Sequence, residues 1–558
     1  MKAKKIIALI LVAIFSLGIV AACGADDPPP PPPDPGTNGA TGDDVDIPTP
    51  DDLEQLPEAE VRVFENHVVI TYSCPQVVQG LNYNTDCEYA MHILEKFNFT
   101  FEGINVGWGD WNETHAMWIM AQDMPDVIVF NYGSGTHADA ANYVDQGLIR
   151  RLPDDWKSRW PNLAMVHMQT SLGPMLDEFY GGTYFLPRAR FFFSDLGNPL
   201  SDHWSLRLRN DWLNELGIEP QLQYTIPEVL DIARRIRDED PGDMGVNLIP
   251  LALRPSNAAR FFLTSNSTWW NSFFIDDDGL YQWGPFCPAF EEGLILWYEA
   301  FDEGLLGPEF FLFDHNEDVD LFMQTGRVGI IFDGAPTASW GHIYSDFRDF
   351  LGLTDEALGI ANLLGVNGLY HQRDLINFWG AVAFSPTADQ EVVERWLYLM
   401  DFMATRDGYP GTQMGIRGVD WDWENGTLVS FVPPDVRLPG TDGKYPSLGH
   451  VLGSSILWDD LGFDNPNIPL VYREMSRELY RLKLETSDRE SFPYVNWELW
   501  MFDSHEFRMA NGINITDDMT RLVVEATSVD NLLTIFHAWR DAQMGIIQPA
   551  LDQLNANR

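Results

Sequence analysis

Segments that favour β-strands alternate with segments that favour helices along most of this chain. The stretch 60–73, EVRVFENHVVITYS, alternates in polarity and is rich in β-branched residues, which predicts a strand. The stretch 86–98, DCEYAMHILEKFN, carries apolar residues at helical spacing, and 289–306 repeats that pattern over a longer helix. The stretches 124–135 and 326–334 each contain a short, fully apolar strand. This alternation predicts an α/β fold built around buried sheets.

The end of one apolar strand marks the expected ligand-facing edge of such a sheet. Asn131 and Tyr132 directly follow the apolar run DVIVF. In open α/β sheets, ligands bind beyond the carboxyl ends of the strands. We therefore expect both residues to lie where a ligand binds.

One helix start is marked clearly in the sequence. Thr225 opens the stretch TIPEVLDIARRIRDED, with Pro227 and Glu228 close behind it. Threonine is a favoured N-cap, and proline and glutamate suit the first helical turn. The stretch predicts a helix that begins directly after Thr225.

The N-terminus has the layout of a bacterial lipoprotein signal. Lys2, Lys4 and Lys5 form a basic start, and the stretch 6–20 is almost wholly apolar. The Val-Ala-Ala-Cys sequence at 20–23 resembles a lipobox, in which the chain is cut before the cysteine and the sulfur receives a diacylglycerol. An uncleaved membrane anchor is the alternative, although a bilayer span needs about 20 apolar residues.

We therefore expect a signal peptide over 1–22, lipidation of Cys23 and a tether over 23–57. The tether is rich in proline and aspartate, and its prolines at 28–33 favour the extended polyproline II conformation. It would hold a folded body away from the extracellular face of the cell membrane. A generic disordered tail without a spacer role is the alternative.

The acidity of the chain limits its partners. The 558 residues carry a formal net charge of −48. Nucleic acid binds basic surfaces, so it is not an expected partner. Polyanionic glycans are disfavoured for the same reason, and a neutral or cationic ligand fits better. A salty or alkaline medium would explain the acidity equally well.

The sequence lacks the common signatures of catalytic and metal sites. It contains no CxxC pair, no Cys–His zinc spacing, no G-x-S-x-G, no P-loop and no HExxH. The acidic stretch 314–320, DHNEDVD, begins like an EF-hand loop. However, Val319 and Thr325 stand where that loop needs glycine and glutamate. We predict a solvated acidic loop there, no bound metal and no cofactor.

The state of the remaining cysteines is open. If Cys23 is lipidated, Cys74, Cys87 and Cys287 remain. Cys74 and Cys87 could form a disulfide in an exposed, oxidising location. The alternative is that both are half-buried thiols.

Several segments occur in the order found in one family of transport proteins. They are DMPDVIVFNYG, GGTYFLPRARF, LRLRNDWLNELGIEP with TIPEVLDIARRI, EAFDEGLLGPEFF with LFMQTGRVGIIFDGAPTASW, INFWGAVAFSPTADQEVVERWLYLMDFM, and FHAWRDAQMGIIQPALDQLN. Together they resemble the extracellular solute-binding lipoprotein of a bacterial ABC importer, of the oligosaccharide-binding, family 1-like kind. The resemblance covers most of 60–405 and the C-terminal helix, and rests on the ordered set of segments. The stretch 410–520 departs from the smaller family members.

The resemblance implies a periplasmic-binding-protein type II fold. Two α/β lobes are joined by hinge strands, with a ligand cleft between them. The implied first lobe comprises 58–185 and 376–445, and the second comprises 186–375 and 446–558. The implied partners are an oligosaccharide, the membrane subunits of an ABC permease, and the membrane itself through the lipid anchor. The protein would be a monomer without a catalytic residue.

Sugars present apolar C–H faces and polar rims, so aromatic rings and planar polar groups suit their recognition. Trp340 lies in a loop after a predicted strand, Trp379 lies on the return crossing, and Trp421 shares a strand face with Trp423. Packing in the core or at the hinge is the alternative for each ring. The candidate ligand-binding residues are Asn131, Tyr132, Arg188, Trp269, Trp270, Trp340, Trp379 and Trp421.

Arg188 has an alternative role, and three residues outside this set are also candidates. A salt bridge that fixes the hinge is the alternative role for Arg188, and Arg190 beside it is an equivalent candidate. Trp108 and Trp111 flank a glycine-containing turn and are secondary candidates.

We predict a binding protein that is not an enzyme. The rival hypothesis is an anchored carbohydrate-active hydrolase with a pair of carboxylates in an aromatic cleft. Carboxylates are so abundant in this chain that any pair could be mistaken for such a site.

Overall fold

The computed structural model describes most of the chain after residue 61. The described residues are 62–77, 79–132, 136–170, 172–189, 204–267, 273–307, 309–313, 324–334, 350–371, 378–433, 455, 466–467, 470–487 and 497–556. The expected signal peptide (1–22), the lipidated Cys23 and the tether (23–57) lie outside these residues. Within them, none of the helices combines the length and the apolar character that a bilayer crossing requires.

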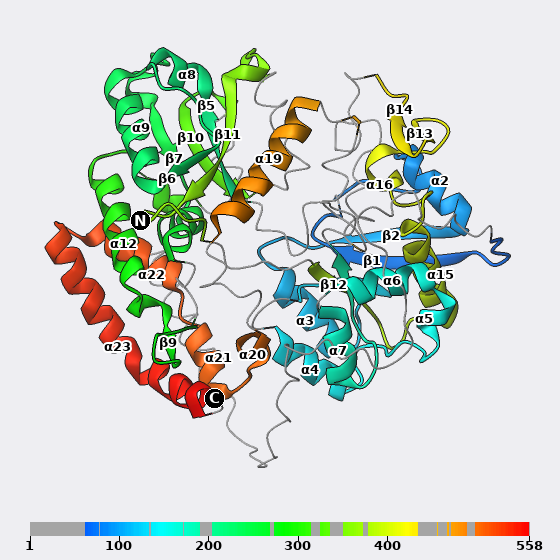
Figure 1. Ribbon diagram of the computed structural model, residues 1–558. Coiled ribbons are helices and arrows are strands. Elements are labelled where there is room, and N and C mark those ends of the chain that lie inside the picture. Colours follow the sequence, from blue (N-terminus) through cyan, green and yellow to red (C-terminus); the bar gives the residue numbers. More distant parts are fainter. Residues whose placement is uncertain are drawn as a thin grey trace, which may run out of the picture. The chain divides into compact units, whose positions relative to one another are not determined.

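The first lobe is built on a five-stranded sheet in the order β2-β1-β3-β12-β4. Strands β1, β2 and β3 pair in parallel, whereas β12 is antiparallel to both β3 and β4. A strand from late in the chain therefore completes a sheet that begins near its start (Figure 1). The strands are β1 (Val68–Cys74), β2 (Phe99–Asn105), β3 (Val127–Phe130), β4 (Leu186–Ala189) and β12 (Phe378–Phe384).

Helices cover both faces of this sheet. Successive side chains of a strand point to opposite faces, so Val127 and Val129 pack in one core while Ile128 and Phe130 pack in the other. The first-lobe elements outside the sheet are α2 (Glu88–Phe97), α3 (Trp111–Ala121), α4 (His137–Asp145), α5 (Trp156–Arg159), α6 (Pro161–Gln169), α7 (Leu172–Tyr180), α15 (Gln390–Met403), α16 (Gly411–Met414), β13 (Trp421–Glu424) and β14 (Thr427–Ser430). Helix α20 (Trp497–Met501) contributes side chains to cores of both lobes.

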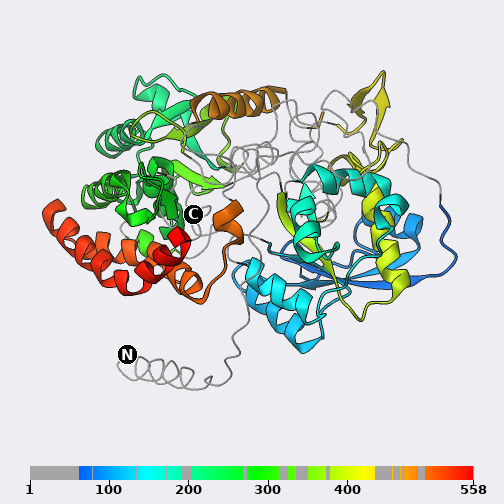
Figure 2. The same ribbon diagram turned by 60° about the horizontal axis from the view of Figure 1, so that its bottom comes forward.

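The second lobe is built on a sheet in the order β6-β11-β5-β10-β7. Strand β10 is parallel to β7, and β5 runs antiparallel to its neighbours β10 and β11. One face is covered by the main core of this lobe. Helix α19 lies against the other face (Figure 2), where its Leu479 shares a core with strand residues. The strands are β5 (Trp204–Arg209), β6 (Gln223–Thr225), β7 (Ile249–Ala252), β10 (Val328–Gly334) and β11 (Leu358–Leu364).

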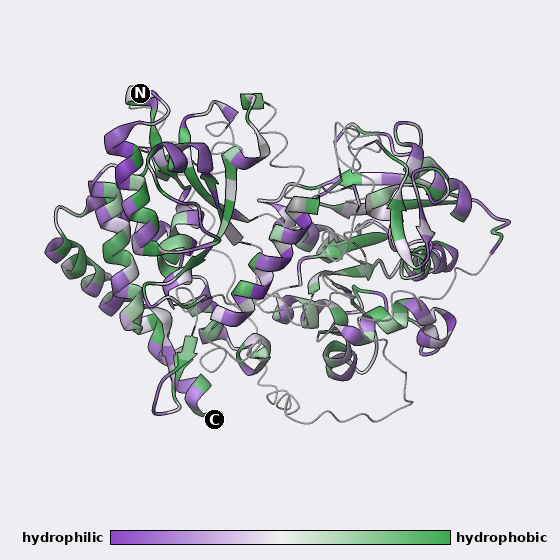
Figure 3. Cartoon of the chain, turned by 45° about the horizontal axis from the view of Figure 1, so that its top comes forward, coloured by the Kyte–Doolittle hydropathy of each residue, from purple (hydrophilic) through white to green (hydrophobic). Residues whose placement is uncertain are grey.

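The sheet strands are mostly hydrophobic, whereas the helices mix hydrophobic and hydrophilic residues (Figure 3), as expected for helices that cover a buried sheet. The other second-lobe elements are α8 (Asn210–Glu215), α9 (Ile226–Glu239), η2 (Gly245–Asn247), α10 (Pro255–Ala259), η3 (Arg260–Thr264), α11 (Ser265–Ser267), β8 (Phe273–Ile275), β9 (Tyr281–Trp283), η4 (Gly284–Phe286), α12 (Pro288–Asp302), η5 (Phe310–Leu312), η7 (Asp355–Ala357), α19 (Leu470–Thr486), α21 (His505–Asn511), α22 (Ile515–Glu525) and α23 (Val529–Ala556).

The predicted local elements are confirmed with shorter bounds. The stretch 60–73 contains β1, 86–98 contains α2, and 289–306 contains most of α12. Helix α9 begins with a capping box: Thr225 Oγ1 accepts a hydrogen bond from Glu228 N at 3.4 Å, and Glu228 Oε2 accepts one from Thr225 N at 2.8 Å. The α/β fold class and the two-lobe organisation are those that the sequence predicts.

Two observations bear on the predicted lobe boundaries. Strand β4 begins at residue 186 and pairs with β12, so the first lobe extends through Ala189. The stretch 446–558 was expected to lie wholly in the second lobe. Instead, Trp500 and Met501 belong to a first-lobe core, where the Trp500 ring stacks on Tyr132 with centroids 5.6 Å apart. The neighbouring Leu499 and Phe502 pack against the second-lobe core, so this segment contacts both lobes.

Cys74 and Cys87 are thiols in the structure, and no disulfide joins them. Cys74 ends β1, and Cys87 directly precedes α2. Both side chains are buried in one hydrophobic core of the first lobe. A buried cysteine behaves there as a small apolar side chain, so the hypothesis of a disulfide is corrected.

Candidate functional site

Three tryptophans gather at the carboxyl end of the first-lobe parallel strands. Trp108 follows β2, Trp111 begins α3, and Trp379 lies in β12. The ring centroids are 5.9 Å apart for Trp108 and Trp111, 6.0 Å for Trp108 and Trp379, and 5.2 Å for Trp111 and Trp379. We call these three residues the tryptophan platform.

The three rings of the platform differ in exposure. Trp111 is buried, and its Nε1 donates a hydrogen bond to the Val129 carbonyl at 3.0 Å, which ties the platform to strand β3. Trp379 is half-buried. Trp108 is 59% exposed, which is unusual for so large an apolar side chain. The platform therefore has a fixed base and an exposed aromatic surface.

A bulge in β12 sets the position of Trp379. The register of β12 against β4 shifts between Phe378 and Ala381, and Gly380 between them has a φ of 60°. A Cβ atom at Gly380 would lie 3.1 Å from the carbonyl oxygen of Phe130, which is tighter than ordinary packing. Glycine permits both the positive φ and the close approach. The bulge places Trp379 beside Trp111.

Polar side chains adjoin the platform. The guanidinium carbon of Arg188 lies 4.4 Å from the centroid of the Trp379 ring, which is cation–π geometry. Arg188 is itself buried, so it holds the ring rather than presenting its charge to solvent. Asn131 is half-buried, and its Nδ2 donates a hydrogen bond to Oδ1 of the exposed Asn112 at 2.8 Å. This amide pair supplies donors and acceptors beside α3.

Two predicted site residues serve packing instead. Tyr132 is buried, its hydroxyl shares a 2.8 Å hydrogen bond with that of Tyr180, and burial raises its pKa. Trp421 is fully buried, and its Nε1 donates a hydrogen bond to the Gly415 carbonyl at 2.9 Å. Neither side chain offers surface to a ligand in this structure, so we remove both from the candidate site. The predicted residues Trp269, Trp270 and Trp340 lie outside the described residues.

The second lobe has a related pair that sequence reasoning missed. Trp204 begins β5 and pairs with Gly334, the last residue of β10. Because the two strands are antiparallel, Trp204 lies at the carboxyl end of β10. The guanidinium carbon of Arg260 lies 4.5 Å from the Trp204 ring centroid, and both side chains are half-buried. Only the strand register reveals this placement.

A buried polar cluster fixes the same edge of the second lobe. Asp333 is buried near the end of β10, and its Oδ2 lies 3.6 Å from Arg207 Nη2. Asn257 Nδ2 donates a hydrogen bond at 3.0 Å to the Phe332 carbonyl. The cluster joins β5, β10 and helix α10, so it holds the strand end beside Trp204 in a defined position.

The resolved pKa shifts of the described carboxyl groups run in one direction. Among the described carboxyl groups, those with a shifted pKa all have it lowered, as in Glu303, where a hydrogen bond from Arg234 is the main cause. In the described part of the chain, three or more His, Cys, Asp or Glu side chains never cluster so that they could hold a metal ion.

The two lobes together have the fold seen in solute-binding proteins. No protein-family model matches the sequence, and no curated protein matches it. Among solved structures, the alginate-binding protein AlgQ2, described as lacking its calcium ion, superposes with a TM-score of 0.63 at 15% identity, over 89% of this chain and 99% of that one.

Two further similar structures share this fold. The S. pneumoniae ABC-transporter substrate-binding protein FusA in complex with kestose gives a TM-score of 0.60 at 15% identity, over 88% of this chain and 100% of that one. An HMO-binding solute-binding protein from Bifidobacterium longum infantis, associated with an ABC transporter, gives a TM-score of 0.57 at 14% identity, over 88% of this chain and 98% of that one. The predicted type II fold is confirmed.

Proposed function

We propose that the protein captures a neutral oligosaccharide outside the cell and delivers it to an ABC permease. The observation that carries this proposal is the tryptophan platform, an exposed aromatic surface at the edge of an α/β sheet where ligands bind. Two of the similar structures support it, because FusA in complex with kestose and the HMO-binding protein are both associated with ABC transporters.

The side chains at the platform would make different kinds of contact with a sugar. A sugar ring would place its C–H face on Trp108, while Asn131 and Asn112 bond its hydroxyl groups. Arg188 would hold Trp379 in place through its guanidinium group.

Closure of the lobes would complete the site. A ligand stabilises a closed state only through contacts that the open state lacks, so both lobes must contribute. Trp204 and Arg260 are the second-lobe residues that we assign to this role. Trp269, Trp270 and Trp340 remain proposed contacts.

A neutral ligand agrees with the charge of the chain. The net charge of −48 disfavours a polyanionic ligand. We further propose that the protein is a monomer held on the extracellular face of the membrane by lipid on Cys23. It would bind the membrane subunits of the permease there.

Glycan binding and turnover can be separated directly. Purified protein is incubated with maltohexaose, cellohexaose, xylohexaose, nystose and oligoalginate, followed by calorimetry, thermal denaturation and product analysis. A neutral ligand at about 100 times its Kd should stabilise the fold by about 2.7 kcal/mol without turnover. Release of shorter sugars would instead support the anchored hydrolase. Absence of binding by every neutral glycan, in both calorimetry and denaturation, would refute the proposal.

A further inference from the structure

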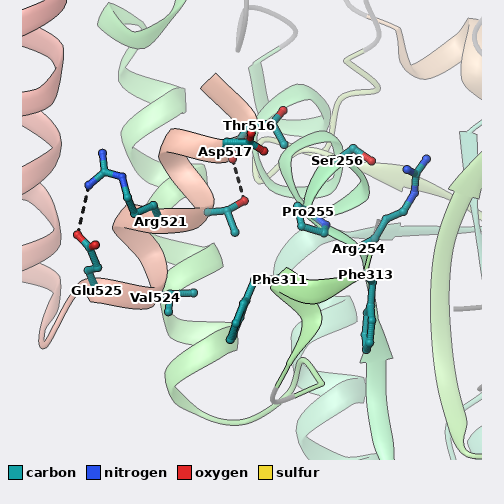
Figure 4. A pocket seen from close by; sticks show the side chains of 11 residues that line it. Arg254, Pro255, Ser256, Phe311, Phe313, Thr516, Asp517, Arg521, Val524 and Glu525 are labelled. Atoms are coloured by element: carbon teal, nitrogen blue, oxygen red, sulfur yellow. Dashed lines mark hydrogen bonds and ion pairs between the residues drawn. The ribbon is translucent and has the colours of Figure 1, made fainter. Parts of the chain in front are cut away.

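A cavity lies within the second lobe. Its volume is about 490 Å³, and it lies between helix α22 and the segments that carry Arg254 and Phe311 (Figure 4). This volume falls in the range of about 300–1,000 Å³ that small-molecule sites occupy. The tryptophan platform is on the first lobe, so this cavity is a separate feature.

One side of the cavity is aromatic. Phe311 and Phe313 project from η5 and the residue after it, and Val524 of α22 lies near the Phe311 ring (Figure 4). Phe311 is 37% exposed, although it lies beside a well-packed core. An exposed phenyl ring that lines a cavity provides a flat apolar surface for the C–H face of a sugar.

The other sides of the cavity are polar and close to charge balance. Arg521 Nη1 lies 3.2 Å from Glu525 Oε2, and Nη2 lies 3.4 Å from Asp518 Oδ1, so carboxylates offset its charge. Asp517 adds a further negative charge, and Arg254 a positive one. An anionic ligand would meet these carboxylates, and a purely apolar ligand would desolvate them without compensation.

The cavity reaches the ligand-facing edge of the second sheet. Arg254 lies two residues beyond Ala252, the last residue of β7. Strand β7 is parallel to β10, so Arg254 lies at the same sheet edge as the end of β10, where Trp204 also lies. Carboxyl ends of parallel strands are where α/β sheets bind ligands.

From these observations we propose that the cavity is a second carbohydrate site, which takes one uncharged sugar residue against Phe311. The proposal rests on the proposed function, because it assumes that the protein binds a neutral glycan. The aromatic surface and the balanced polar groups match a ligand that is apolar on one face and hydroxylated at its rim. The hydroxyl groups of an uncharged sugar can form hydrogen bonds with Asp517 and Arg254.

The test is hydrogen–deuterium exchange of the full-length chain in detergent, with and without each neutral glycan of the panel. A bound glycan should slow exchange in α22 and η5 as well as around the platform. The Phe311→Ala variant should lose the slowing in α22 and weaken binding about two- to tenfold, the value of one aromatic contact. Leu312→Ala is the matched control, because Leu312 is 60% exposed and does not line the cavity.

The possible outcomes separate the two proposals. If a glycan protects the platform but not α22, or if Phe311→Ala binds and protects like the wild type, the second site is refuted while the proposed function stands. If no neutral glycan changes exchange anywhere or binds by calorimetry, both proposals fail. Slowed exchange in α22 that Phe311→Ala removes and Leu312→Ala retains supports the second site.

Discussion

The Trp108→Ala variant tests the platform most directly. The side chain of Trp108 is 59% exposed, and a tryptophan buries at most about 250 Å² in a contact, so about 150 Å² is available to a ligand. A sugar that covers half of it removes about 75 Å² from water, worth about 2 kcal/mol at about 25 cal/mol per Å². Binding should therefore weaken about thirtyfold.

The fold should tolerate this change. Trp108 contacts the rings of Trp111 and Trp379, and loss of such aromatic contacts costs about 1 kcal/mol. In a body of about 500 residues, that cost should lower the ligand-free Tm by about 1 °C. Calorimetry with the neutral glycans measures the affinity, and differential scanning calorimetry measures the Tm.

Met120→Ala is the matched control for Trp108→Ala. Met120 is 56% exposed on α3, the helix that carries Trp111, and belongs to no candidate site. Its affinity should stay within about twofold of the wild type, since surface substitutions rarely exceed about 0.5 kcal/mol. If Trp108→Ala binds as tightly as Met120→Ala, or if its ligand-free fold collapses, the platform reasoning is wrong.

Two other predictions rest on the structure, and a third rests on the N-terminal sequence. Trp421→Ala should destabilise the protein by about 3–5 kcal/mol, because a fully buried ring is removed, and an unchanged Tm would contradict its assignment to packing. Burial lowers the pKa of His115 from 6.5 to about 4, so the unfolded chain takes up a proton before the folded one as pH falls. The contribution of His115 to the free energy of unfolding is complete above pH 6.5 and is lost as the pH falls from 6.5 to about 4. The free energy of unfolding should therefore be about 2 kcal/mol lower at pH 5 than at pH 7. His115→Gln should remove that part of the pH dependence in urea titrations, and a slope identical to the wild type would contradict the stated cause. Cys23→Ser should abolish incorporation of radioactive palmitate and release the protein from the detergent phase, and retained label would refute lipidation at this residue.

Local sequence patterns determined the elements and the fold class. The β-branched alternation before Cys74, the apolar run 127–130 and the capping residue Thr225 each specify their element through the nearest neighbours in the chain. Strand and helix preferences depend on a few adjacent residues, so a single sequence reveals them. Helix α19 was not predicted from the sequence. It lies in the stretch 410–520, which departs from the smaller family members.

The candidate site could be predicted only in part from the sequence. Asn131 follows a strand end, and the structure places it beside the platform as the pattern indicates. Trp421 showed a strand alternation that was compatible with an exposed face. Alternation tells which residues share a face, but not whether another part of the chain covers that face. Gly415 and its neighbours cover it here.

The tertiary structure alone decided which residues meet. Trp379 joins Trp111 because β12 pairs with β3 across some 250 residues of sequence, and the bulge at Gly380 then sets its ring. Arg188 and Trp500 are likewise placed by long-range packing, on Trp379 and Tyr132 respectively. Strand pairing and ring stacking of this kind depend on how distant segments are brought together, which no local pattern encodes. The chain's own sequence therefore determined its strands, helices and acidic character, and its three-dimensional packing determined the aromatic surface that we propose binds sugar.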